Sequence, residues 1–157
     1  MSDRSKQSPK TKPFQSIDDY LELATSDTML VVPVYSSERP LKNSAGLLDW
    51  RLYGFISRMI RNGRLNGQSG EHVLIPFHHH LGSRHVLCVG MGPRNYLTDE
   101  RVATEVGSTA SKKIKQLGFK KVKIVDDFFE KTSNDVGDKI RKKFESHFQG
   151  METGWIS

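Results

Sequence analysis

The chain has 157 residues, of which 36% are hydrophobic and 27% are charged, and it carries a formal net charge of +6. This length suits one domain with one hydrophobic core, and no segment approaches the roughly 18 consecutive apolar residues of a transmembrane helix. A single cysteine, Cys88, excludes an internal disulfide bond and a multi-cysteine zinc site. The first residues lack the apolar centre of a signal peptide, so we expect a cytoplasmic protein that does not bind a membrane.

The N-terminal tail is predicted to be disordered and basic. Residues 1–13 are rich in serine, lysine and proline and show no apolar periodicity. Four basic residues and one acidic residue give this tail a charge of +3. The whole chain has 24 basic and 18 acidic residues, so the remaining 20 basic and 17 acidic residues give the rest of the chain a charge of +3 as well. Such a charge favours contact with nucleic acid or another anion, although a solvated surface is the simpler interpretation.

The first half of the domain is predicted to contain a short helix, a buried strand and a longer helix. Ser16 is a suitable N-cap for the short helix over 17–23, with Asp19 at its third position. The run 29–35 is continuously apolar and rich in β-branched residues, which favours a buried strand that ends, or reaches an edge of the sheet, at Pro33. After a loop over 36–45, the longer helix is predicted from 47 to 62.

One face of this longer helix is apolar. The apolar residues recur at spacings of three and four, at Leu48, Leu52, Phe55, Ile56, Met59 and Ile60. We therefore expect four residues to pack on the sheet: Leu52, Phe55 and Met59, and Trp50 from the flank of the helix. If this face is core, Phe55→Ala should cost about 3–5 kcal/mol.

The same stretch is basic. Its arginines lie mostly outside the apolar stripe and form a candidate nucleic-acid-binding surface: Arg51, Arg58, Arg61 and Arg64.

The second half of the domain alternates strands and helices. Strands are predicted over 72–77 and 84–90, a helix from Thr98 to Leu117, a strand over 121–125 and a helix over 135–148. Residues 14–150 then form a single domain, and residues 151–157 are left as a C-terminal tail. The order of the elements indicates an α/β protein with a mixed sheet between layers of helices.

The sharpest local motif is an apolar strand that runs into Gly90-Met91-Gly92 before a helix. Glycines in such a turn allow a ligand to approach the backbone closely, and free amides at a helix start, here near Thr98, attract phosphate. The third glycine of a dinucleotide-binding fingerprint is missing, since Asn95 stands in its place. Residues 90–92 and Thr98 are therefore a candidate ligand site, with a plain turn at the end of the strand as the alternative.

The other polar groups form no complete catalytic set. His78-His79-His80 suggests a two-point imidazole site, but no carboxylate or thiol follows at ligand spacing, and a polar hairpin loop is the better interpretation. Cys88 lies between apolar neighbours of a predicted strand, as expected for a buried thiol. Asp126-Asp127 ends a strand, but adjacent side chains of a strand point to opposite faces. We therefore predict no enzyme activity, no metal and no cofactor.

Residues 45–92 resemble a known domain. The segment Ala-Gly-Leu-Leu-Asp-Trp-Arg-Leu-Tyr-Gly at 45–54, Gly-Gln-Ser-Gly-Glu at 67–71 and Val-Leu-Cys-Val-Gly-Met-Gly at 86–92 are similar to the N-terminal domain of leucyl aminopeptidases. With the order of elements, the likeness covers residues 28–125. It implies a macro-domain-like, three-layer fold in the half of those enzymes that is not catalytic. The family's catalytic Asn-Thr-Asp-Ala-Glu-Gly-Arg stretch does not occur in this sequence, so no catalytic residue carries over.

Three functions follow from the residues and the resemblance. The first, which we favour, is a non-catalytic relative of that N-terminal domain, free-standing or part of a longer chain, that binds a protein partner or another copy of itself. The second is a macro-like domain that binds ADP-ribose or another phosphorylated nucleotide at residues 90–92. The third is DNA binding through the four arginines, since some bacterial members of the resembled family bind DNA.

Overall fold

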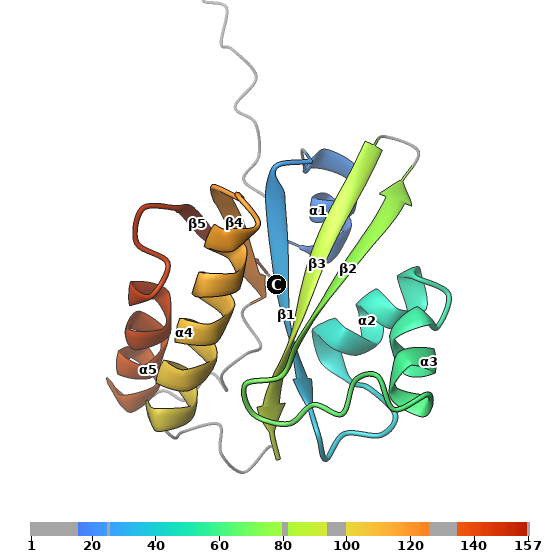
Figure 1. Ribbon diagram of the computed structural model, residues 1–157, viewed down its shortest axis with the longest axis horizontal. Helices are drawn as coiled ribbons and strands as arrows, with labels where there is room; N and C mark the ends of the chain where they lie inside the picture. The colour runs from blue at the N-terminus through green and yellow to red at the C-terminus, as the bar shows by residue number, and fades with distance from the viewer. Residues whose placement is uncertain (1–15, 25, 80–81, 94–99, 126–134, 157) are drawn as a thin grey trace, which may run out of the picture.

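The computed structural model describes residues 16–24, 26–79, 82–93, 100–125 and 135–156, which form a five-stranded sheet with helices on both faces (Figure 1). The helices are α1 (Ile17–Leu23), α2 (Asn43–Arg51), α3 (Phe55–Arg61), α4 (Glu100–Gln116) and α5 (Asp135–Ser146). The strands are β1 (Thr28–Tyr35), β2 (His72–His79), β3 (Gly82–Gly92), β4 (Lys121–Val125) and β5 (Glu152–Ile156). Helices α1, α2 and α3 cover one face of the sheet and α4 and α5 the other, so the predicted three-layer α/β fold is confirmed.

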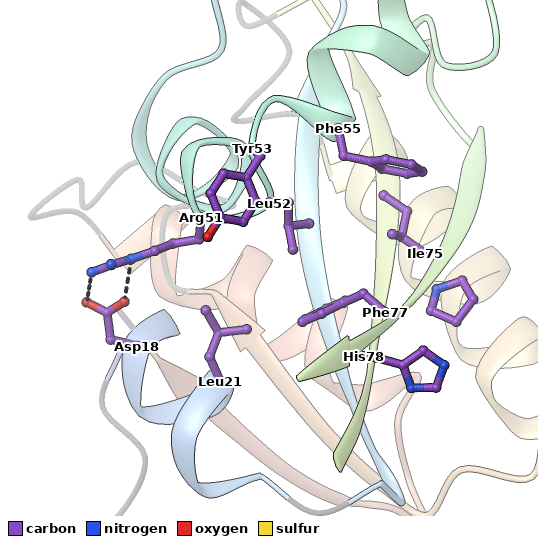
Figure 2. A pocket seen from close by; sticks show the side chains of 10 residues that line it. Asp18, Leu21, Arg51, Leu52, Tyr53, Phe55, Ile75, Phe77 and His78 are labelled. Carbon is purple, nitrogen blue, oxygen red and sulfur yellow. Dashed lines mark hydrogen bonds and ion pairs between the residues drawn. The ribbon is translucent and has the colours of Figure 1, made fainter. Parts of the chain in front are cut away.

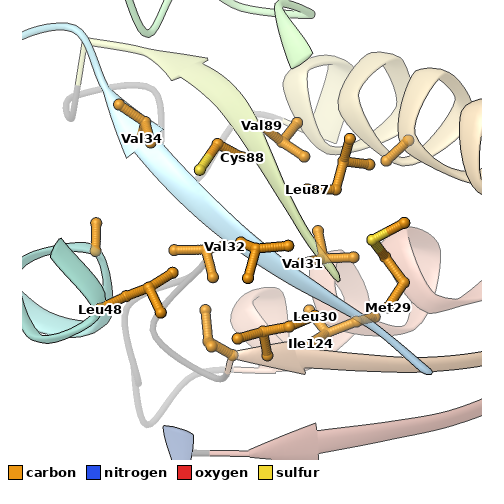
Figure 3. Packing of buried hydrophobic residues seen from close by; sticks show 14 of the residues in the cluster. Met29, Leu30, Val31, Val32, Val34, Leu48, Leu87, Cys88, Val89 and Ile124 are labelled. Atoms are coloured by element: carbon orange, nitrogen blue, oxygen red, sulfur yellow. The ribbon is translucent and has the colours of Figure 1, made fainter. Parts of the chain in front are cut away.

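The strand order β2-β3-β1-β4-β5 places β1 at the centre of a mixed sheet. Strand β1 is parallel to β3 and β4, and β4 is parallel to β5, whereas β2 and β3 are antiparallel. All eight residues of β1 are buried, which explains why its sequence is apolar without alternation. Figure 3 shows its side chains meeting those of β3 and Leu48 of α2 in the core.

The strand does not end at Pro33, but it reaches a local edge there, which is the second of the two predicted alternatives. Pairing of β1 with β3 includes Pro33, opposite Val89, and continues to Tyr35. Pairing with β4 ends earlier, at Val31 opposite Ile124. The proline is tolerated because β1 has already lost its β4 neighbour at this point, so the missing N–H costs no ladder hydrogen bond on that side.

Polar contacts fix α1 to the sheet. The Oγ atom of Ser16 accepts a hydrogen bond from the N–H of Asp19 (3.1 Å), which confirms the predicted N-cap. The hydroxyl of Tyr20 lies 3.0 Å from the carbonyl oxygen of Thr28 in β1 and 2.6 Å from that of His85 in β3. Burial raises the pKa of Tyr20 to about 12, so its hydroxyl stays protonated as a donor.

The segment predicted as one long helix forms two helices, α2 and α3. Between them, Tyr53 (φ 56°) and Gly54 (φ 76°) adopt the left-handed conformation, which interrupts the helical hydrogen bonding. The carboxylate of Asp49 then holds the start of α3, because it accepts hydrogen bonds from the N–H (2.9 Å) and the hydroxyl of Ser57. The prediction of a continuous helix is therefore wrong.

Two of the predicted core residues face solvent. Trp50 is 69% exposed and Phe55 is 41% exposed, so the expectation that they pack on the sheet is wrong. Leu52 and Met59 pack against the core as predicted, and both are half-buried.

The second half of the chain follows the predicted order with one added strand. The strands predicted over 72–77, 84–90 and 121–125 are confirmed as β2, β3 and β4. Residues 152–156, predicted to be part of a tail, instead form β5 parallel to β4. Trp155 of β5 also packs near Phe144 of α5, with ring centroids 6.2 Å apart. The predicted basic tail (1–13), Thr98, Asp126 and Asp127 lie outside the residues that the structure describes.

Alanine substitutions of Phe55 and Ile56 should give very different results. Ile56→Ala should lower the free energy of unfolding by about 2–5 kcal/mol, because the fully buried side chain leaves a cavity in the core. Phe55→Ala should cost about 1 kcal/mol or less, because the ring is 41% exposed. Urea unfolding of both variants measures these values, and an equal loss in the two would contradict the placement of α3.

His147 follows α5 and packs against α4. A Cβ atom at Gly107 of α4 would lie only 2.8 Å from the Cδ2 atom of His147, so a larger residue at 107 would displace the ring. The Nε2 atom of His147 is buried and has no hydrogen-bond partner among the described residues. Burial lowers the pKa of His147, and the positive charges of Lys143 and Lys115 lower it further.

The lowered pKa of His147 predicts a loss of stability in mild acid. As the pH falls through the ordinary histidine pKa of about 6.5, the unfolded chain binds the proton before the folded chain does. The free energy of unfolding should therefore fall between about pH 7.5 and pH 5.5, and His147→Gln should reduce that fall. Urea unfolding at both pH values checks this, and an unchanged pH dependence in the variant would show that another group is responsible.

Candidate functional site

A cleft of about 690 Å³ lies between β2 and the helices α1, α2 and α3 (Figure 2). Its lining residues are Asp18, Leu21, Arg51, Leu52, Tyr53, Phe55, Ile75, Pro76, Phe77 and His78. Leu21, Leu52 and Phe77 point toward one another across it, and Phe55 and Ile75 lie together at its other end. The cleft therefore has an apolar interior with polar groups at its margin, which is the composition typical of binding sites.

An ion pair closes one side of the cleft. The Nε atom of Arg51 lies 2.9 Å from Oδ1 of Asp18, and Nη2 lies 3.0 Å from Oδ2, so the two planar groups meet in a two-point contact. The guanidinium also lies 4.9 Å from the ring centroid of Trp50. An exposed pair of this kind contributes about 0–1 kcal/mol to stability, so its main effect is to hold Arg51 beside the aromatic ring.

Arg58 is held in a similar way on α3. Its Nη1 atom donates to the carbonyl oxygen of Tyr53 (2.7 Å), and its guanidinium lies 5.8 Å from the ring centroid of Phe55. Arg61 and Arg64 are exposed further along the chain. The structure thus places the four predicted arginines on α2, α3 and the turn that follows, with Arg51 and Arg58 engaged by neighbouring groups. Nucleic-acid binding by these arginines stays a prediction.

We use the name α2–α3 surface for the exposed large and basic side chains of α2, α3 and the turns that follow them, which are Leu47, Trp50, Arg51, Tyr53, Phe55, Arg58, Arg61 and Arg64. Tyr53, at 90% exposure, is the residue that sequence reasoning missed here, and the sequence signal for it is the glycine that follows. Residues 39–64 contain six basic residues and one acidic residue, Asp49, whose carboxylate is bound to Ser57. The surface therefore combines large aromatic side chains with positive charge.

A second pocket, of about 450 Å³, lies at the carboxyl ends of β1 and β3. Its lining residues are Ser36, Gln68, Ser69, Gly92, Pro93, Arg101, Val102 and Glu105. Open α/β sheets commonly bind ligands at this end of their strands. Of the predicted ligand residues, Gly92 lines the pocket, whereas Met91 is buried in the core and Thr98 is not among the described residues.

The glycines that end β3 pack against the protein's own loop over residues 66–71. The N–H of Gly90 donates to the carbonyl oxygen of Glu71 (2.6 Å), and the N–H of Gly92 donates to that of Gly67 (2.8 Å). A Cβ atom at Gly90 would lie 2.0 Å from the carbonyl oxygen of Gln68, so any larger residue would displace the loop. The two glycines therefore let the loop approach β3, and the loop engages their amides.

The same loop encloses the side chain of Glu71. Its carboxylate accepts hydrogen bonds from the N–H groups of Asn66 (3.0 Å), Gly67 (2.8 Å) and Gln68 (3.2 Å). Successive backbone N–H groups arranged in this way form a concavity that binds anions. Here a carboxylate of the chain itself occupies that concavity, so the Gly-Gln-Ser-Gly-Glu segment orders the loop.

The remaining predicted groups have simple surroundings. Cys88 is buried, and burial raises its pKa to about 12, so the thiol stays protonated. No group of three or more His, Cys, Asp or Glu side chains suited to a metal ion occurs within the described ranges, which do not include His80. Over those same ranges, no helix combines the length and the apolar character required to cross a membrane.

Glu71→Gln should destabilise the domain. The neutral amide keeps the size of the side chain but loses the charge-assisted hydrogen bonds to the loop, a loss of about 1–3 kcal/mol. Glu105→Gln is the matched control, because the carboxylate of Glu105 is exposed and lies 3.4 Å from the hydroxyl of Ser69. Urea unfolding compares the two variants. A loss no larger than that of the control would mean that the Glu71 carboxylate does not order the loop.

Comparison with known proteins identifies related sequences. The profile of the cytosol aminopeptidase family, N-terminal domain, matches residues 31–150. A probable cytosol aminopeptidase from Pseudomonas syringae pv. tomato is 30% identical over 117 residues, which cover 74% of this chain and 23% of that protein. The chain thus spans less than a quarter of the length of this curated relative.

Two kinds of solved structure share the fold. A leucine aminopeptidase mutant from tomato has a TM-score of 0.64 at 12% identity, over 92% of this chain and 31% of its own. The DarG macrodomain of Thermus aquaticus has a TM-score of 0.62 at 12% identity, over 86% of this chain and 92% of its own. The DarG macrodomain of Mycobacterium tuberculosis has a TM-score of 0.60 at 14% identity, over 91% of this chain and 95% of its own. These similarities confirm the macro-domain-like architecture. The profile match over residues 31–150 shows that the chain belongs to the cytosol aminopeptidase family and corresponds to its N-terminal domain.

Proposed function

We propose that this domain is a non-catalytic binding module that takes a protein partner on its α2–α3 surface. The observation that carries the proposal is the exposure of Tyr53 and Phe55, which line the cleft, together with that of Trp50, whose ring lies against Arg51 of the same lining. Single exposed apolar side chains are ordinary on protein surfaces, but large aromatic residues gathered at the mouth of a cleft are typical of interaction sites.

The chemistry of this surface matches that of protein interfaces. Tryptophan, tyrosine and arginine are the residues whose truncation weakens such interfaces most. Arg51 already lies against Trp50, and Arg58 against Phe55. A partner therefore has fewer side chains to order when it binds, which reduces the entropy cost of association.

The extent of the family match supports a role without catalysis. The profile matches the N-terminal domain of the family, and the curated relative is a much longer protein of which this chain covers 23%. We therefore assign recognition, rather than peptide hydrolysis, to the domain.

A second candidate is the binding of ADP-ribose or another phosphorylated nucleotide in the pocket lined by Ser36, Gly92 and Arg101. Two observations favour it: the position of the pocket at the carboxyl ends of β1 and β3, and the fold shared with the DarG macrodomains. The engaged amides of Gly90 and Gly92 weigh against it, because a phosphate group needs donors that are free to turn toward it.

Capture of a partner on the immobilised domain tests the first proposal. The same cell extract is passed over four immobilised proteins: the parent, Trp50→Ala, Tyr53→Ala and Leu117→Ala. Each retained protein is then purified, and its affinity for all four is measured. Leu117 is the matched control, because it is 39% exposed but follows α4 on the opposite face of the sheet. We expect the parent and Leu117→Ala to bind one protein equally, and the two aromatic variants to bind it at least about tenfold more weakly.

Three other results would reject this assignment. Equal retention by all four proteins would exclude the α2–α3 surface as the binding site. A DNA duplex whose binding is lost in Arg61→Glu and falls steeply with salt would favour nucleic acid as the partner. A rise in Tm with ADP-ribose would favour the pocket at the strand ends, since a ligand at 100 times its Kd adds about 2.7 kcal/mol to the free energy of unfolding.

A further inference from the structure

The charge around the cleft limits what can enter it. The α2–α3 surface carries four arginines, of which Arg51 lines the cleft, and two carboxylates that contact these helices are engaged within the domain. Asp18 is paired with Arg51, and Asp49 is bound to Ser57. A partner with exposed carboxylates is attracted to such a surface, whereas a basic partner is repelled.

Two occupants from the chain itself are disfavoured by the same charge. Residues 1–13 carry four basic residues and one acidic residue, so this segment is repelled by the arginines of the α2–α3 surface. A second copy that docked through the same surface would bring the arginines of both copies together. The occupant is therefore a different, acidic molecule.

The edge strand beside the cleft argues against a partner that adds a strand to the sheet. Strand β2 lies at the edge of the sheet and pairs with β3 on its other side. Pro76, in the middle of β2, is exposed and has no N–H, and edge strands accept proline where that position faces solvent. A strand docked on β2 would therefore miss a hydrogen bond at its centre.

We propose that the partner presents an acidic amphipathic helix to the cleft, an inference that rests on the proposed function. A helix satisfies its own backbone hydrogen bonds and needs none from β2. Its apolar side chains, spaced three and four residues apart, enter the cleft among Leu52, Phe55 and Phe77. Its carboxylates pair with Arg61 and Arg64, which are exposed at the end of α3 and in the turn that follows it.

Three fluorescein-labelled peptides test this inference on the full chain. Each has about 18 residues, a length at which an isolated helix begins to be stable. The first carries leucines on one helical face and glutamates elsewhere, the second has the same composition in scrambled order, and the third replaces every glutamate with lysine. Fluorescence anisotropy at about 0.15 M ionic strength gives each Kd.

We expect the first peptide to bind at least about tenfold more tightly than the other two. The double variant Arg61→Glu/Arg64→Glu should weaken its binding by about tenfold or more, and Leu117→Ala should leave it unchanged. Amide chemical shifts in the 15N spectrum of the parent should change mainly at α2, α3 and β2, with Leu52 and Phe77 as markers of the cleft.

Several outcomes would overturn the inference. If the scrambled or the lysine peptide binds with equal affinity, an acidic amphipathic helix is not required. If the chemical-shift changes are confined to α4 and α5, the binding site lies on the other face of the sheet. Tighter binding of a single-stranded oligonucleotide at the same residues would assign the surface to nucleic acid. If Trp50→Ala abolishes capture of a protein but the peptides show no preference, the proposed function stands and the helix inference fails. If the first peptide binds in the cleft but Trp50→Ala and Tyr53→Ala capture proteins from the extract as well as the parent does, the proposed function fails.

Discussion

The complete burial of β1 constrains the rest of this structure. Because β1 is parallel to both of its neighbours, the chain must return along the sheet before it enters β3 and again before it enters β4. The antiparallel strand β2, which follows α2 and α3, makes the first return, and α4 makes the second. The helices of these two connections lie on opposite faces of the sheet (Figure 1) and keep β1 out of water. The cleft and the pocket at the strand ends both lie along the same connections.

The connection from β1 to β3 explains why aromatic side chains face solvent. The large side chains that α2 and α3 bury completely are Leu48 and Ile56. The left-handed turn at Gly54 sets the direction of α3 relative to α2. Trp50 and Tyr53 are left on the outer side, where they gain little burial free energy from folding. The core therefore does not require these two large side chains to be where they are, and this is the basis of the proposed interaction surface.

The strands and the cap of α1 were predictable because their signals are local, as in the continuous apolar run of β1 and the Ser16 cap. The break between α2 and α3 was not predicted, because the apolar spacing of three and four continues across it and Phe55 fits the helical stripe. Strand β5 has five residues and depends on pairing with β4, a contact between distant segments that no short pattern encodes. Long-range pairing and a single left-handed turn therefore account for both errors.

The glycines at residues 90–92 show why such a motif is ambiguous in a sequence. A missing Cβ atom permits a close approach to the backbone but does not specify which group approaches. At Gly90 the approaching group is the carbonyl oxygen of Gln68, and in the neighbouring loop the anion held by backbone amides is the carboxylate of Glu71. Groups of the chain itself therefore occupy much of the space and many of the backbone donors that the pattern would offer to a ligand. A loop that fills its own anion site is ordered without a ligand, whereas the exposed aromatic side chains of the α2–α3 surface contribute little to the folding of the domain.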